Sequence, residues 1–103
     1  MDKVYQINEI KEKLHPIFAG SPVYRAVLFG SYAKGVADDR SNLDIVLDSR
    51  GELHGIRFYG ILEDVVSALV KKVDMFEISE IRPGSPIMDE ITKDGVILYE
   101  RQG

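Results

Sequence analysis

Apolar residues recur at helical spacing in three parts of the chain. Steps of three or four between apolar positions over residues 4–17 predict an amphipathic helix, which Pro16 and Gly20 are expected to end. Over residues 61–70, apolar pairs recur every four residues and predict a second helix with a wide buried face. A third helix is expected over 85–95, because serine and proline suit its start and glycine its end.

Strand patterns lie between these helices. One segment is a mostly apolar run rich in β-forming residues, and another alternates apolar and polar residues over 42–48. Strands are expected over 23–29, 42–48, 73–78 and 96–99. Residues 30–41 are expected to form a loop with a short helical turn, and residues 49–60 a connection. This order of elements predicts an α/β (α+β) fold of about four strands with helices packed on the sheet.

Length and charge limit the classes of function. A chain of 103 residues has room for one domain and one core, so a single domain over 1–103 is expected. Acidic residues outnumber basic ones by 17 to 13, and no basic stripe for binding a nucleic acid is present. No apolar stretch is long enough to span a membrane, and the N-terminus has no apolar signal core. Without cysteine there are no disulfides or thiolate sites. A cytoplasmic protein is expected from the absence of a signal core.

One stretch differs from an ordinary scaffold. Gly30-Ser31 ends a strand and opens a helical turn, so the backbone there can approach phosphate oxygens and offer them free N–H groups. Asn42 and Asp44 lie two apart on the next strand, about 7 Å between Cα atoms, and therefore share a face. Asp74, among apolar residues of a third strand, is placed to add another oxygen ligand. The pattern predicts a site for a nucleoside triphosphate with Mg²⁺.

These residues resemble a known family. Gly30–Ser31, ten intervening residues and then Asn42-x-Asp44 are similar to the glycine-serine…aspartate-x-aspartate signature of the polymerase-β-like nucleotidyltransferases. Residues 30–35, Gly-Ser-Tyr-Ala-Lys-Gly, resemble its minimal (MNT-type) branch especially closely. The segments 73–74 and 94–100 also look like that branch. The resemblance thus runs from the first strand to the end of the chain.

The resemblance implies a mixed sheet flanked by helices and transfer of AMP from ATP with Mg²⁺. Matched by position, Gly30 and Ser31 would bind the triphosphate, and Asp44 would ligate metal. Asp74 would be the third carboxylate, which ligates metal and deprotonates the acceptor hydroxyl. Position 42 carries an aspartate in the family and an asparagine here, so Asn42 would be a weaker metal ligand. Lys34 and Arg40 could reach a phosphate, although such lysines and arginines are usually solvated.

The resemblance also implies a partner. MNT-type proteins similar to MntA are antitoxins that modify a tyrosine of a HEPN-type toxin, and this short chain has no room for a domain that selects an acceptor. We therefore expect such a partner, or a homo-oligomer. The alternative is a catalytically impaired protein that binds nucleotide or partner and acts by contact, because Asn42 brings no charge to the metal. Asn42→Asp separates these two hypotheses.

Overall fold

The computed structural model describes residues 4–102. The first three residues, part of the segment without an apolar signal core, and Gly103 lie outside that range. In chain order the elements are α1 (Ile7–Ala19), β1 (Arg25–Phe29), α2 (Gly30–Lys34), β2 (Leu43–Asp48), α3 (Ile56–Leu69), β3 (Val73–Glu77), the 3-10 helix η1 (Ile78–Glu80), α4 (Pro86–Asp94) and β4 (Val96–Glu100). No helix within residues 4–102 is long and apolar enough to cross a membrane.

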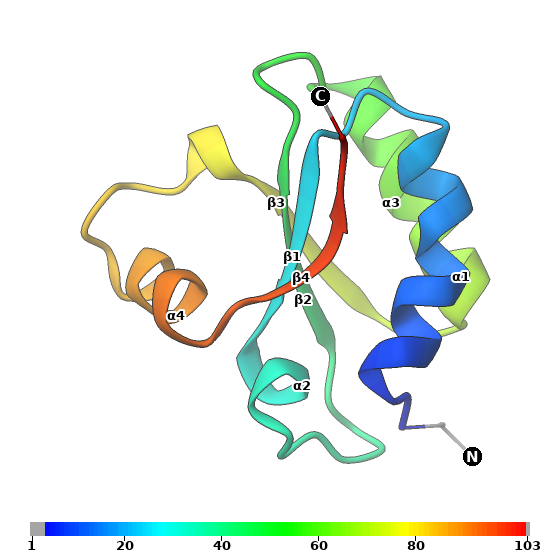
Figure 1. Ribbon diagram of the computed structural model, residues 1–103, viewed down its shortest axis with the longest axis vertical. Coiled ribbons are helices and arrows are strands. Elements are labelled where there is room, and N and C mark those ends of the chain that lie inside the picture. Colours follow the sequence, from blue (N-terminus) through cyan, green and yellow to red (C-terminus); the bar gives the residue numbers. More distant parts are fainter. Residues whose placement is uncertain (1–3, 103) are drawn as a thin grey trace.

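The four strands form one mixed sheet, as the sequence analysis expects, and their order is β3-β2-β1-β4. β1 lies antiparallel to both β2 and β4, whereas β2 and β3 are parallel. Parallel neighbours need a crossover connection, and α3 supplies it. In Figure 1 the sheet is seen along its plane, with α1 and α3 side by side over one face, α4 over the other and α2 at one end.

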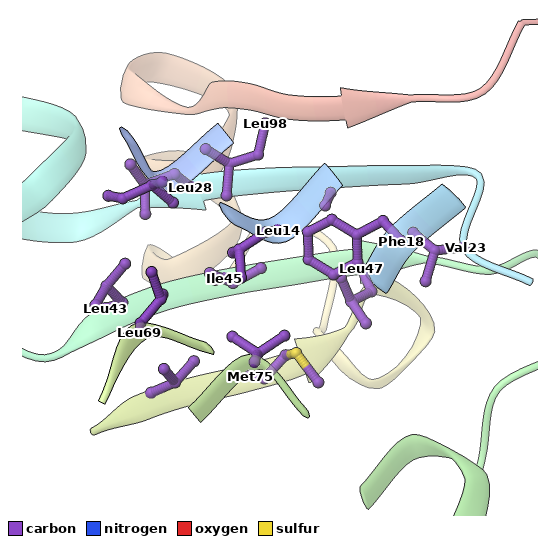
Figure 2. Close-up of a cluster of buried hydrophobic side chains, with 14 of the residues drawn as sticks. Leu14, Phe18, Val23, Leu28, Leu43, Ile45, Leu47, Leu69, Met75 and Leu98 are labelled. Carbon is purple, nitrogen blue, oxygen red and sulfur yellow. The ribbon is translucent and has the colours of Figure 1, made fainter. Parts of the chain in front are cut away.

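The hydrophobic core lies between the sheet and the α1–α3 layer. Alternate residues of β2, namely Leu43, Ile45 and Leu47, are fully buried and join this core. Figure 2 shows Leu14 and Phe18 of α1 reaching toward the strands. Because side chains alternate along a strand, the residues between these three buried positions point to the opposite face. The core packing of β2 therefore fixes the direction in which its polar residues face.

Two element boundaries differ from those expected. Pro16 does not end α1 but lies inside it, and Gly20 is the C-cap. A proline removes the hydrogen bond to the carbonyl four residues earlier, and here both Pro16 and Glu12 are exposed, so water can satisfy that carbonyl. The helix expected over 61–70 is α3, and it begins at Ile56 instead of near residue 61. Its first turn is anchored by the buried Phe58, while Gly60 faces solvent, where a missing side chain costs little packing.

Candidate functional site

The polar residues singled out in the sequence meet at one end of the sheet. Phe29, the last residue of β1, pairs with Asp44 of β2, and Asp44 pairs with Asp74 of β3. Their neighbours Leu43 and Val73 belong to the core, so both aspartates lie on the face opposite α1 and α3. The prediction that residues 42, 44 and 74 gather at one end of adjacent strands is confirmed.

Gly30 is required at its position for two reasons. Its φ of 75° lies in the left-handed region that residues with a side chain rarely adopt. A Cβ atom there would also overlap the Oδ2 atom of Asp44. α2 starts at this residue, and no side chain caps its first turn. The backbone N–H groups of Gly30 and Ser31 therefore begin a helix directly beside a carboxylate, an arrangement that suits a phosphate accompanied by a cation.

Asp44 lies in an environment that opposes its negative charge. Burial, then the charge of Asp74, then that of Glu90 raise the pKa of Asp44 to about 6. Like charges that approach each other in a partly buried site favour the neutral form, unless a cation joins them. Asp44 and Asp74 thus form a pair of like charges that a cation between them would stabilise.

Asn42 contacts one member of this pair, Asp74, through its side-chain amide. Its Nδ2 atom donates a hydrogen bond of 3.4 Å to Oδ2 of Asp74. The nitrogen therefore faces the carboxylate, and the amide must turn to present its oxygen to a metal. Residues 4–102 contain no group of three or more acidic, histidine or cysteine side chains that could hold a metal, which agrees with an asparagine at position 42.

These residues fit a divalent cation. Asp44 and Asp74 supply two carboxylates whose mutual repulsion a cation would remove. Mg²⁺ is commonly held by one or two carboxylates together with water and substrate phosphates. The side-chain oxygen of Asn42 can add a neutral ligand. The donor set is suitable for Mg²⁺ brought in with a triphosphate, with less charge than three aspartates would give.

The structure adds one carboxylate that the sequence did not indicate. Glu90 of α4 lies near Asp44, since its charge helps raise the pKa of that aspartate. Its Oε1 atom is 3.1 Å from Nζ of Lys34, and both side chains are partly exposed. Lys34 is thus paired with α4 rather than directed only to solvent. Glu90 lies 46 residues after Asp44, and the packing of α4 against α2 and β1 brings them together.

Comparison with known proteins identifies the family. The family model described as "Polymerase beta, Nucleotidyltransferase" matches residues 12–103. A predicted protein adenylyltransferase of Methanocaldococcus jannaschii is 36% identical over 80 residues, which cover 75% of this chain and 83% of that protein. The chain belongs to the polymerase-β-type nucleotidyltransferase family.

Solved structures show the same fold. A chain in a toxin–antitoxin structure with AMP-PNP has a TM-score of 0.72 at 22% identity, covering 89% of this chain and 74% of the other. A chain in the complex of a tri-AMPylated Shewanella oneidensis HEPN toxin with an MNT antitoxin has a TM-score of 0.65 at 19% identity, covering 92% and 73%. The expected nucleotidyltransferase fold is therefore confirmed.

Proposed function

We propose that this protein transfers AMP from ATP, with Mg²⁺, to a hydroxyl group of a HEPN-type partner, as a cytoplasmic antitoxin. Family membership supports nucleotidyl transfer. The relative from M. jannaschii supports a protein as acceptor. The similar fold in complexes with HEPN toxins supports the partner. The observation that carries the proposal is the close approach of Gly30 to the carboxylate of Asp44, which puts the uncapped start of α2 beside the proposed metal ligand.

Each residue has a defined role in this reaction. The N–H groups of Gly30 and Ser31 bind the triphosphate, and Asp44 and Asp74 hold Mg²⁺ with Asn42 as a neutral ligand. When bound, Mg²⁺ neutralises charge on the phosphates. Asp74 accepts the proton of the acceptor hydroxyl, whose oxygen forms a bond to the α-phosphorus. The bond from this phosphorus to the bridging oxygen breaks, and pyrophosphate leaves with that electron pair.

The test is AMP transfer in the purified complex. The chain is expressed with the HEPN-type protein encoded beside it, and the complex is incubated with ATP and Mg²⁺. Intact-mass measurement of the partner should show the addition of AMP, and Asp44→Ala should abolish that addition. A partner whose mass never changes, with either this chain or its Asn42→Asp variant, contradicts the proposal.

A second function, an antitoxin that acts mainly by contact, is favoured by the amide of Asn42. Its hydrogen bond occupies an oxygen of Asp74, and the site has one negative charge fewer than three aspartates would supply. Removing one preorganised electrostatic contact commonly lowers a rate about 10²–10³-fold. We therefore expect weak transfer with measurable nucleotide binding.

Asn42→Asp decides between the two functions. It should raise Mg²⁺-dependent transfer at least about tenfold, followed with labelled ATP. Asn8→Asp is the matched control, because it adds the same charge at an exposed position of α1. If the unaltered protein is already fully active and the Asn42→Asp variant gains nothing, the assignment of Asn42 to the metal site is wrong.

A further inference from the structure

The outer edge of β3 carries backbone groups without partners. β3 is the last strand on one side of the sheet, and within residues 4–102 no strand lies beyond it. The Leu43 N–H donates to the Lys72 carbonyl at 3.1 Å, so Asp74 and Phe76 direct their N–H and carbonyl groups to β2. The alternate residues of the strand direct theirs outward, namely Val73, Met75 and Glu77.

Water reaches these outward groups poorly. Val73, Met75 and Glu77 are 7%, 8% and 4% exposed, and none of their N–H groups donates a hydrogen bond to a residue that the structure describes. Buried backbone N–H groups are nearly always paired in folded proteins. An unpaired strand edge is also a template on which another strand can form. The edge of β3 is therefore suited to receive an extended segment.

The two connections of β3 run to the faces of the sheet and do not extend along this edge. The chain enters β3 from α3, which lies over one face. It leaves through η1, which contacts β2, and continues to α4 over the other face, a path that can be followed in Figure 1. An added strand would thus lie beside β3 without meeting either connection.

A hollow of about 240 Å³ adjoins the same edge. Its lining combines Met75 and Phe76 of β3, Glu80 of η1 and the start of α3. Aromatic rings contribute to its wall from Phe58 and Tyr59, whose ring centroids are 5.8 Å apart. Met75 faces the core beneath α3, so the hollow lies on the α3 side of the strand edge. An apolar side chain of an added strand can enter it.

The register of an added strand brings a hydroxyl to Asp74. In an antiparallel pair, the residue opposite Met75 exchanges backbone hydrogen bonds with it and places its side chain on the α3 side. The following residue lies opposite Asp74 on the other face, where paired Cα atoms are only about 4.5 Å apart. A serine or threonine hydroxyl at that position lies beside the Asp74 carboxylate. A tyrosine can reach the carboxylate from the next position on that face.

A second copy of this chain does not supply that hydroxyl. β3 reads Val-Asp-Met-Phe-Glu and contains no serine, threonine or tyrosine. Two copies joined through β3 would therefore present no acceptor to Asp74. The chemistry of this edge fits a segment of another protein.

We propose that the acceptor protein adds an extended segment, antiparallel, to the outer edge of β3. An apolar side chain of the segment fills the hollow, and the hydroxyl of the following residue lies at Asp74. The use of this hydroxyl rests on the proposed function, whereas the addition of the strand can be measured without ATP.

The experiment uses a blocked seven-residue peptide of valine and lysine with a central leucine–threonine pair. Its binding to the unaltered protein is followed by NMR and by hydrogen exchange of backbone amides. In the free protein the Val73 and Met75 N–H groups should exchange faster than those of Asp74 and Phe76, which are bonded to β2. Bound peptide should slow the exchange of Met75 at least about fivefold, because that N–H gains a hydrogen bond.

Two methylated peptides test the register. N-methylation of the leucine removes the donor that faces β3 and should weaken binding at least about fivefold. N-methylation of the threonine is the matched control, because in an antiparallel pair that N–H points away from β3. The control should change affinity by less than about twofold.

Tyr59→Ala tests the hollow. Tyr59 is 66% exposed, so its truncation should leave the fold intact and should weaken the leucine–threonine peptide about three- to fivefold. ATP affinity should not change. An alanine–threonine peptide, which has no side chain to fill the hollow, should bind the variant and the unaltered protein equally. Ile97→Ala, on β4 at the opposite edge of the sheet, is the matched control.

Four results would overturn the proposal. These are unchanged affinity when the leucine is methylated, a loss confined to methylation of the threonine, full binding of the leucine–threonine peptide to Tyr59→Ala, and a Met75 N–H that is protected in the free protein by dimerisation. The last result would assign the edge to a second copy. Failure of AMP transfer alone, with strand addition as expected, contradicts the proposed function and leaves the docking edge intact.

Discussion

Two carboxylates lie at opposite ends of the paired strands β2 and β3, and their surroundings are opposite in character. Glu77 is 4% exposed and accepts three hydrogen bonds, from the Ser49 N–H at 3.1 Å, the Ser49 hydroxyl at 2.6 Å and the Ser79 N–H at 3.2 Å. The carboxylate of Asp44 accepts no hydrogen bond from any residue of the range 4–102 and faces the charges of Asp74 and Glu90. The fold surrounds one carboxylate with hydrogen-bond donors and places the other beside like charges.

This difference shows how the molecule separates stability from chemistry. A buried acid surrounded by donors fastens loops together. The Ser49 hydroxyl, which donates to Glu77, also accepts a hydrogen bond from the Leu53 N–H at 3.0 Å. An acid that lies close to other acids lowers the stability of the free protein. A bound cation removes this repulsion and restores the stability. A substitution of Glu77 should therefore lower stability and leave activity unchanged. A substitution of Asp44 should instead lower activity and stabilise the metal-free protein.

The largest effect should follow from Asp44→Asn. In the more active Asn42→Asp background, it should lower AMP transfer about 10²–10³-fold, because it removes charge beside the reacting phosphate. The rate is measured with labelled ATP and excess partner. Glu77→Gln is the control, and its transfer rate per folded molecule should stay within about twofold at low temperature. Equal losses in the two variants would mean that Asp44 acts only through the fold.

Glu77→Ala should produce the largest loss of stability. It leaves the Ser49 N–H, the Ser49 hydroxyl and the Ser79 N–H without their buried acceptor, at a cost of about 2–3 kcal/mol. Urea unfolding followed by circular dichroism measures this cost. Glu100→Ala removes an equivalent side chain from an exposed ion pair with Arg25 and should change stability by less than about 1 kcal/mol. Similar losses at the two positions would contradict the structural role of Glu77.

The raised pKa of Asp44 gives a pH dependence in the metal-free protein. An acid whose pKa rises from 3.8 to about 6 on folding binds its proton more tightly in the folded state. Its stabilising contribution is complete below pH 3.8 and is lost as the pH rises through about 6. Because Asp44 is only partly buried, we discount the effect to about 1 kcal/mol, or about 4–8 °C in Tm.

Asp44→Asn should accordingly raise Tm at pH 7.5 without metal and leave it nearly unchanged at pH 4. Addition of Mg²⁺ with ATP should then stabilise the unaltered protein more than the variant. Thermal unfolding at the two pH values provides the test. A variant that is less stable at pH 7.5 would show that Asp44 is already well satisfied in the free protein.

The smallest effect concerns Val70, the residue that ends α3. Its φ of 51° and ψ of 46° place a β-branched residue in the left-handed region, and 81% of the residue is exposed. Val70→Gly should relieve that backbone cost and stabilise the protein by about 0.5–1 kcal/mol, after the greater freedom of glycine in the unfolded chain is subtracted. Val70→Ala, which keeps a Cβ atom, should gain less. A destabilised glycine variant would show that the side chain contributes packing at this helix end.

The sequence predicted which residues gather at this end of the sheet better than it predicted some element boundaries, and the reasons are local. Gly30, Asp44 and Asp74 each lie at the end or the start of a strand whose pattern is clear, and strand pairing alone brings them together. Glu90 was not predicted, because a helix packed across the sheet places it, and no spacing in the chain encodes that contact. The early start of α3 was missed since Gly55 and Gly60 resemble a linker until the burial of Phe58 is known.

The parallel pairing of β2 with β3 has a consequence for the order in which the site assembles. Gly30, which follows β1, and Asp44 of the neighbouring antiparallel strand β2 are only 14 residues apart, whereas Asp44 and Asp74 are 30 residues apart and pair only across the α3 crossover. Closing the longer segment has the larger entropic cost and slows its formation. The start of α2 and Asp44 can therefore come together early in folding, whereas Asp74 joins them only when the longer α3 crossover has closed.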